Sequence, residues 1–72
     1  MAYFRYLIDA SALDTETCRQ ICDLIATHTA IFSTDQSHPG VYAACFDEAD
    51  LSILENPIFR DCKITNITQS GI

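Results

Sequence analysis

The hydrophobic and polar positions of this chain change their period along its length and predict a succession of strands and helices. Residues 3–8 are rich in aromatic and branched apolar side chains, which favour a β-strand. Alternation would put Phe4, Tyr6 and Ile8 on one face of this strand and Tyr3, Arg5 and Leu7 on the other. Apolar residues on both faces are typical of a central strand, so Tyr3 and Leu7 are expected near solvent if nothing covers the second face.

A helix is predicted from the Ser11–Asp14 region to about His28. Ser11 and Asp14 are both N-cap candidates in capping-box spacing, and Asp14 and Glu16 suit the positive end of a helix dipole. The apolar positions have the i, i+3, i+4, i+7 spacing of one helical face, namely Cys18, Ile21, Cys22 and Ile25. This stripe is expected to pack on a sheet.

The next two strands, residues 30–34 and 41–46, are expected to form a hairpin. Pro39 and Gly40 suit the two central positions of a type II turn between them, because proline presets φ and glycine accepts a positive φ. The hairpin would bring both strands into the same sheet as the first strand.

A second helix is predicted after the hairpin, with Asp47 as its N-cap and Asp50 three residues on. Its buried stripe would consist of Leu51, Leu54 and Ile58. Asn56-Pro57 interrupts this pattern, so residues 56–61 could be helix, a short extra turn or loop. Residues 62–68 are rich in β-branched side chains and predict the closing strand.

The resulting order, βαββαβ, predicts an α+β fold of the ferredoxin-like type. In this arrangement two helices cover one face of a four-stranded antiparallel sheet, and right-handed crossovers put the first and third strands in the middle. A chain of 72 residues allows one domain, residues 1–72, with a modest core that buries about 60% of the unfolded chain's surface. The second sheet face is expected to stay open.

Composition places the protein among compact domains outside the membrane. Hydrophobic residues make up 49% of the chain and charged residues 19%, which is too apolar for a disordered polypeptide. The apolar runs are far shorter than the roughly 20 residues that cross a bilayer. The first residues lack the pattern of a signal peptide, so a cytoplasmic location is expected.

Charge limits the class of partner. Ten acidic residues against four basic ones give a net charge of −6, which repels nucleic acid and anionic lipid. Direct binding to nucleic acid or to a membrane is therefore not expected. The acids either serve solubility or face a basic protein, and in the second case the candidates are Asp9, Asp14, Glu16, Asp23, Asp47, Glu48 and Asp50.

No catalytic, cofactor-binding or metal-binding residues are assigned. The chain has no glycine-rich phosphate loop and no nucleophile motif, so an enzyme is not expected. Its four cysteines, Cys18, Cys22, Cys45 and Cys62, are interpreted as small buried apolar residues. In topology and length the chain resembles the heavy-metal-associated domains of copper chaperones, but Cys18 and Cys22 are separated by three residues instead of two. A thiol or metal carrier using these two cysteines is kept as an alternative.

Recognition of another protein is the expected function. Tyr3, Leu7 and Tyr42 are the candidate exposed anchors, and the acids would pair with lysine and arginine of the partner. In acidity, small size and lack of catalytic motifs the chain resembles the small inhibitors that phages and mobile elements make, including anti-CRISPR proteins. The functional hypothesis is an inhibitor that occupies a basic surface of host nucleic-acid-binding defence machinery, although the resemblance itself does not identify the target. The alternative is a homodimer or accessory subunit that closes the open sheet face.

Overall fold

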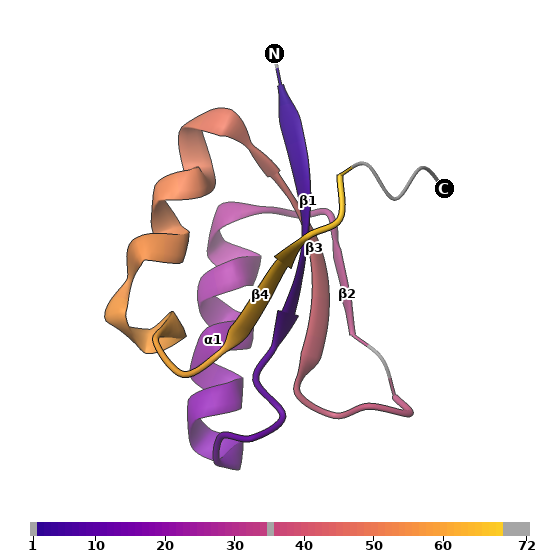
Figure 1. The fold of residues 1–72 in the computed structure, drawn as a ribbon, viewed down its shortest axis with the longest axis vertical. Helices are drawn as coiled ribbons and strands as arrows, with labels where there is room; N and C mark the ends of the chain where they lie inside the picture. Colours follow the sequence, from indigo (N-terminus) through magenta and orange to yellow (C-terminus); the bar gives the residue numbers. More distant parts are fainter. Residues whose placement is uncertain (1, 35, 69–72) are drawn as a thin grey trace.

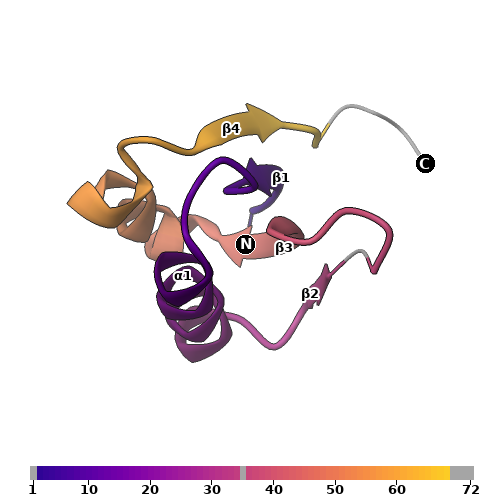
Figure 2. The ribbon, with the colours of Figure 1, turned by 90° about the horizontal axis from the view of Figure 1, so that it is seen from below.

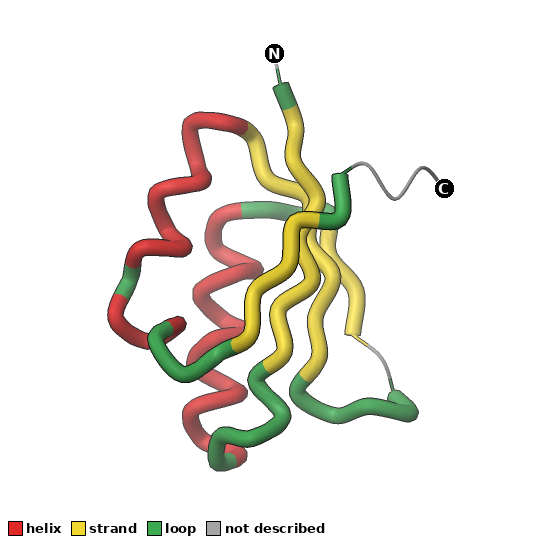
Figure 3. Tube along the Cα trace, viewed as in Figure 1, coloured by secondary structure: helices red, strands yellow, loops and turns green. Residues whose placement is uncertain are grey.

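The structure is a computed structural model that describes residues 2–34 and 36–68. Its strands are β1 (Tyr3–Asp9), β2 (Phe32–Thr34), β3 (Val41–Asp47) and β4 (Lys63–Asn66). One α-helix, α1 (Thr15–His28), follows β1, and two 3-10 helices, η1 (Glu48–Glu55) and η2 (Pro57–Phe59), follow β3 (Figures 1 and 3). Within these ranges no helix is long and apolar enough to cross a bilayer.

The four strands form one antiparallel sheet in the order β2-β3-β1-β4. The longest pairing joins β1 and β3, from Tyr3 opposite Asp47 to Asp9 opposite Val41. Viewed nearly along the strands, α1 and the 3-10 helices lie on the same side of the sheet (Figure 2). This confirms the prediction of an α+β fold with helices on one face of a four-stranded antiparallel sheet, and it is compatible with a ferredoxin-like arrangement.

Helix α1 begins where the sequence places its second cap candidate. The Asp14 carboxylate accepts a hydrogen bond from the backbone N–H of Thr17 at 2.7 Å, which satisfies one of the free donors of the first turn. Ser11 is not a cap, because its N–H and its hydroxyl both donate to Asp9, at 3.0 and 2.5 Å. The predicted stripe is correct: Ile21 and Ile25 are fully buried, and the two cysteines beside them are half-buried.

The cap leads to a prediction for stability at acidic pH. Hydrogen bonds from Thr17 hold the pKa of Asp14 below its ordinary value of 3.8. The charged cap therefore stabilises the fold above about pH 3.8, and this contribution disappears as the pH falls through the lower folded-state pKa. We expect Asp14→Asn, which caps without ionising, to weaken the pH dependence of the free energy of unfolding in that window.

Urea titrations between pH 2 and pH 5 (roughly the range where carboxylates titrate) measure this dependence. Asp23→Asn makes the same chemical change in the same helix, away from the cap, and should keep the wild-type dependence. An unchanged dependence in Asp14→Asn would contradict the assigned role of the cap.

The hairpin turn between β2 and β3 has the geometry that the sequence predicts. The N–H of Val41 donates to the carbonyl of His38 at 3.1 Å, and Gly40 has a φ of +89°. A Cβ at Gly40 would also lie 3.0 Å from the Cα of Ser11. Both the positive φ and this close approach require glycine at position 40. Glycine thus lets the turn pack directly against the chain after β1.

The second helix differs from the prediction in type and in buried side. Asp47 caps it as expected, accepting from the N–H of Ala49 at 2.9 Å, but the helix is 3-10. It ends at Asn56, whose extended backbone (φ −61°, ψ 134°) is typical of a residue before proline. The predicted stripe of Leu51, Leu54 and Ile58 is only half-buried. Ile53 and Phe59 are the buried residues, because tighter 3-10 winding turns different positions toward the sheet.

The core lies between this helical layer and the inner face of β1 and β3. Phe46 and Ile8, from the two central strands, are fully buried against Ile21 and Ile25 of α1. The ring of Tyr6 packs beside that of Phe46, with a distance of 6.4 Å between the ring centroids. The helices thus bury the core side chains of one sheet face, while the side chains of the other face are not covered by a helix.

Candidate protein-binding face

The candidate site is the sheet face opposite the helices, called the open face below. Directly paired residues in an antiparallel sheet point to the same side, so the pairing defines the members of this face. On β1 and β3 they are Tyr3, Arg5, Leu7, Asp9, Val41, Ala43, Cys45 and Asp47, joined by Ser33 of β2 and Lys63 and Thr65 of β4. Each end of the β1–β3 ladder carries one acid on this face, Asp47 at one end and Asp9 at the other, and the residues of the two strands between them are apolar except for Arg5.

Three large apolar side chains on or beside this face are exposed to solvent. The exposed fractions are 54% for Tyr3, 36% for Leu7 and 63% for Ile31, which precedes β2. The position of Ile31 is fixed, because its N–H donates to the Thr29 hydroxyl at 3.0 Å and its carbonyl accepts from the N–H of Cys45 at 2.9 Å. Tyr3 and Leu7 are thus exposed, as the sequence predicts, and the structure adds Ile31.

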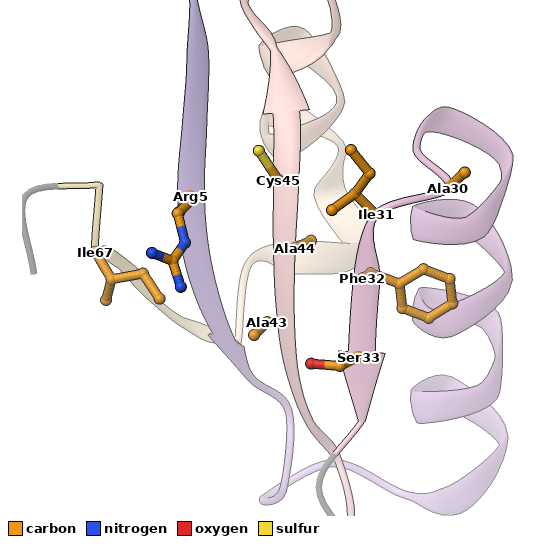
Figure 4. A pocket seen from close by; sticks show the side chains of 9 residues that line it. All are labelled: Arg5, Ala30, Ile31, Phe32, Ser33, Ala43, Ala44, Cys45 and Ile67. Atoms are coloured by element: carbon orange, nitrogen blue, oxygen red, sulfur yellow. The ribbon is translucent and has the colours of Figure 1, made fainter. Parts of the chain in front are cut away.

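The middle of the open face is hollow. Figure 4 shows Arg5 and Ile67 on one side of β3, Ile31 on the other, and the short side chains of Cys45 and Ala43 between them. This hollow has a volume of about 420 Å³. A second hollow of about 390 Å³ continues it toward Leu7 and Val41. The hollows lie over the short side chains of Ala43 and Cys45, which are flanked by the longer Leu7 and Arg5 of β1 and by Ile31 before β2.

Tyr42 is a correction to the predicted anchors. It lies on the covered face of β3 opposite Ile8, is only 7% exposed, and donates its hydroxyl to the carbonyl of Cys18 at 3.2 Å. Burial is the main reason that the pKa of the Tyr42 phenol is raised. Tyr42 therefore joins α1 to the sheet and cannot serve as an exposed anchor.

The seven candidate acids do not gather on one surface. Asp9 and Asp47 lie at opposite ends of the β1–β3 ladder, about 20 Å apart for six steps along a strand. Asp14 and Glu16 lie in the first turn of α1 and Asp23 on its exposed side, whereas Glu48 and Asp50 begin η1. The pairing of these acids with a basic partner stays a prediction, and of the seven only Asp9 and Asp47 belong to the open face itself.

Most of these acids already have a partner within the chain. Glu16 forms an ion pair with Arg19 at 2.7 Å, and Asp50 lies 3.5 Å from Nδ1 of His28, which joins η1 to the end of α1. The hydroxyl and N–H of Ser11 lower the pKa of Asp9, with a smaller contribution from Lys63. Asp14 and Asp47 cap helices. Local structure thus accounts for much of the acidic pattern.

The cysteines divide into two groups. Cys18, Cys22 and Cys62 are half-buried against the core, where Cys18 donates its thiol to the carbonyl of Ala10 at 3.1 Å and burial raises the pKa of Cys62. Cys45 differs from the prediction, because it lines the open face instead of the core. Across residues 2–34 and 36–68, no three His, Cys, Asp or Glu side chains converge to hold a metal ion.

Sequence reasoning missed Ile31, Ala43 and Cys45 as members of the site. The apolar residues of β3 alternate between small ones, at positions 41, 43 and 45, and mostly larger ones at 42, 44 and 46. That difference in side-chain size along β3 is the sequence signal that could have distinguished the residues of the open face from those of the covered face.

Comparison with known proteins gives no assignment. No family model, curated protein or solved structure matches this chain.

Proposed function

We propose that this chain is a non-enzymatic protein-binding protein of ferredoxin-like fold that binds its partner through the open face. The observation that carries the proposal is the exposure of Leu7 and Ile31 beside the hollows over Ala43 and Cys45, together with the exposed Tyr3 on the same face. Aromatic and aliphatic side chains around a concavity are typical of the buried centre of an interface. The opposite face is already occupied by the helices (Figure 2).

The charge of the molecule determines the class of partner in this proposal. Net charge −6 and acids at both ends of the open face, Asp9 and Asp47, favour a protein with lysine or arginine around an apolar centre. Proteins that bind nucleic acid carry such surfaces. The chain would then act in the cytoplasm by occupying that surface, as small phage and mobile-element inhibitors of the anti-CRISPR kind do.

A second copy of this chain is a less suitable partner for the same face. Two copies would bring together two molecules of charge −6, and each would present the same acidic ends to the other. Like charges placed opposite each other across an interface are unfavourable. A protein of opposite charge avoids this cost.

Affinity capture at varied ionic strength tests the proposal. Raising salt from about 0.1 M to about 1 M shortens the Debye length from about 10 Å to about 3 Å, so we expect retention of a basic protein on immobilised wild-type chain to fall steeply. Asp47→Asn with Glu48→Gln should reduce this salt dependence. Retention that is indifferent to salt would contradict the electrostatic part, and a stable homodimer in light scattering would contradict the proposed partner.

A further inference from the structure

The two hollows of the open face form one continuous depression, called the β3 trough below. Both hollows are lined by Ser33 and Ala43, so they meet at the middle of β3. The floor consists of Ala43 and Cys45, and the walls include Arg5 and Leu7 on the β1 side and Ile31 and Ser33 on the β2 side. From Val41 to Cys45 the trough extends about 13 Å along the strand.

We propose that the β3 trough is the seat for an amphipathic α-helix of the partner. The apolar stripe of that helix would enter the trough, and lysine or arginine at one of its ends would meet Asp47 and Glu48. A length of 13 Å corresponds to about nine residues of helix, or two and a half turns. This inference rests on the proposed function and names the part of the partner that the open face recognises.

The position of the trough favours a helix over an extended segment. Residues Tyr42–Ala44 of β3 are paired on one side with β1 and on the other with β2, so this stretch has no free edge for another strand. An extended segment lying across the face would bury backbone groups without hydrogen-bond partners. A helix satisfies its own backbone groups and presents only side chains to the sheet.

The charges around the trough orient such a helix. Asp47 and the exposed Glu48 lie at one end of β3, beside Tyr3. At the opposite end Lys63 lies opposite Asp9 across the β1–β4 ladder and contributes to its lowered pKa, which partly neutralises that end. Arg5 adds positive charge to the wall. Arg5, opposite Cys45, lies next to this same end of β3. Cationic residues of the partner are therefore favourable beyond Arg5, where Asp47 and Glu48 give two negative charges against its one.

Two synthetic peptides of about 15 residues test the proposal with the full chain, a length at which an isolated helix is marginal and forms on binding. Both carry leucines at i, i+3, i+4 and i+7 with glutamines between them; one ends in lysines and the other in glutamates. We expect the lysine peptide to shift the NMR amide signals of Ser33, Ala43 and Cys45, and the glutamate peptide to bind more weakly. Equal binding of both peptides, or shifts confined to α1, would overturn the proposal.

A matched pair of variants separates the trough from the rest of the surface. Ala43→Gln fills the floor with a long polar side chain and should weaken binding of the lysine peptide by at least about tenfold. Ala26→Gln makes the same change on the exposed side of α1 and should alter it by less than about twofold. Equal effects of the two variants would also overturn the proposal, as would an absence of any shift in the wild-type chain.

The proposed function is judged separately from the trough. The capture experiment uses no peptide. Salt-sensitive retention of a protein, combined with no NMR shift from either peptide, would support protein binding and contradict the proposal that a helix binds in the trough. Failure of capture would remove the function on which the inference rests.

Discussion

Phe46→Ala is expected to lower the free energy of unfolding by about 3–5 kcal/mol, the cost of removing a fully buried aromatic side chain and leaving a cavity. Phe46 is fully buried on the central strand β3, beside the ring of Tyr6. A domain of this length has a total stability of only about 4–11 kcal/mol. The variant should therefore unfold at a much lower urea concentration than the wild type, as followed by circular dichroism.

Phe32→Ala is the matched control for this prediction. Phe32 is half-buried on the edge strand β2 and packs against the margin of the core. The same truncation there should cost clearly less, because the residue loses less apolar contact and solvent can reach the space that it leaves. Equal losses in the two variants would contradict the assignment of the core to the inner face of β1 and β3.

The second large effect concerns the partner. Tyr3→Thr with Leu7→Thr removes two exposed apolar side chains from β1 while keeping residues that favour a strand. One central apolar anchor of an interface is worth about 2 kcal/mol or more, so removing both should lower affinity for the captured protein by at least about thirtyfold. Calorimetry or surface plasmon resonance with the purified partner measures this loss.

Salt distinguishes these anchors from the acids. The loss in the double variant should be similar at low and high ionic strength, because apolar burial is not screened by salt. Ala26→Thr, on the exposed side of α1, serves as the control and should bind like the wild type. A double variant that binds as tightly as this control would contradict the assignment of the open face.

Local sequence signals were sufficient to predict the elements whose residue pattern fits only one type of secondary structure. The spacing of Ile21 and Ile25 and the cap at Asp14 predict α1 correctly, because an amphipathic stripe and a side-chain cap both act within a few residues. The type II turn at Pro39-Gly40 is equally local. The helix, its cap and the turn depend on local backbone geometry, which residues a few positions apart in the sequence determine.

The features that were wrong depend on contacts between distant segments. Both faces of β3 are apolar, so only its register with β1 decides that Tyr42 is covered and Ala43 is open. Helix η1 is different, because its limit is local: its apolar pattern fits an α-helix, and Pro57 shortly after it keeps the segment short. For the candidate acids, charge alone does not show position, and only the strand register shows that Asp9 and Asp47 lie on the open face.

The most direct test of the central claim, that the open face binds the partner, is a cross-saturation NMR experiment on the complex with the captured protein. The chain is deuterated and labelled at its methyl groups, and the partner's protons are irradiated. We predict that the methyl signals of Leu7, Val41 and Ala43 lose intensity, whereas those of Ala26 and Thr27 on α1 do not. Loss confined to the methyl groups of α1 would contradict the account.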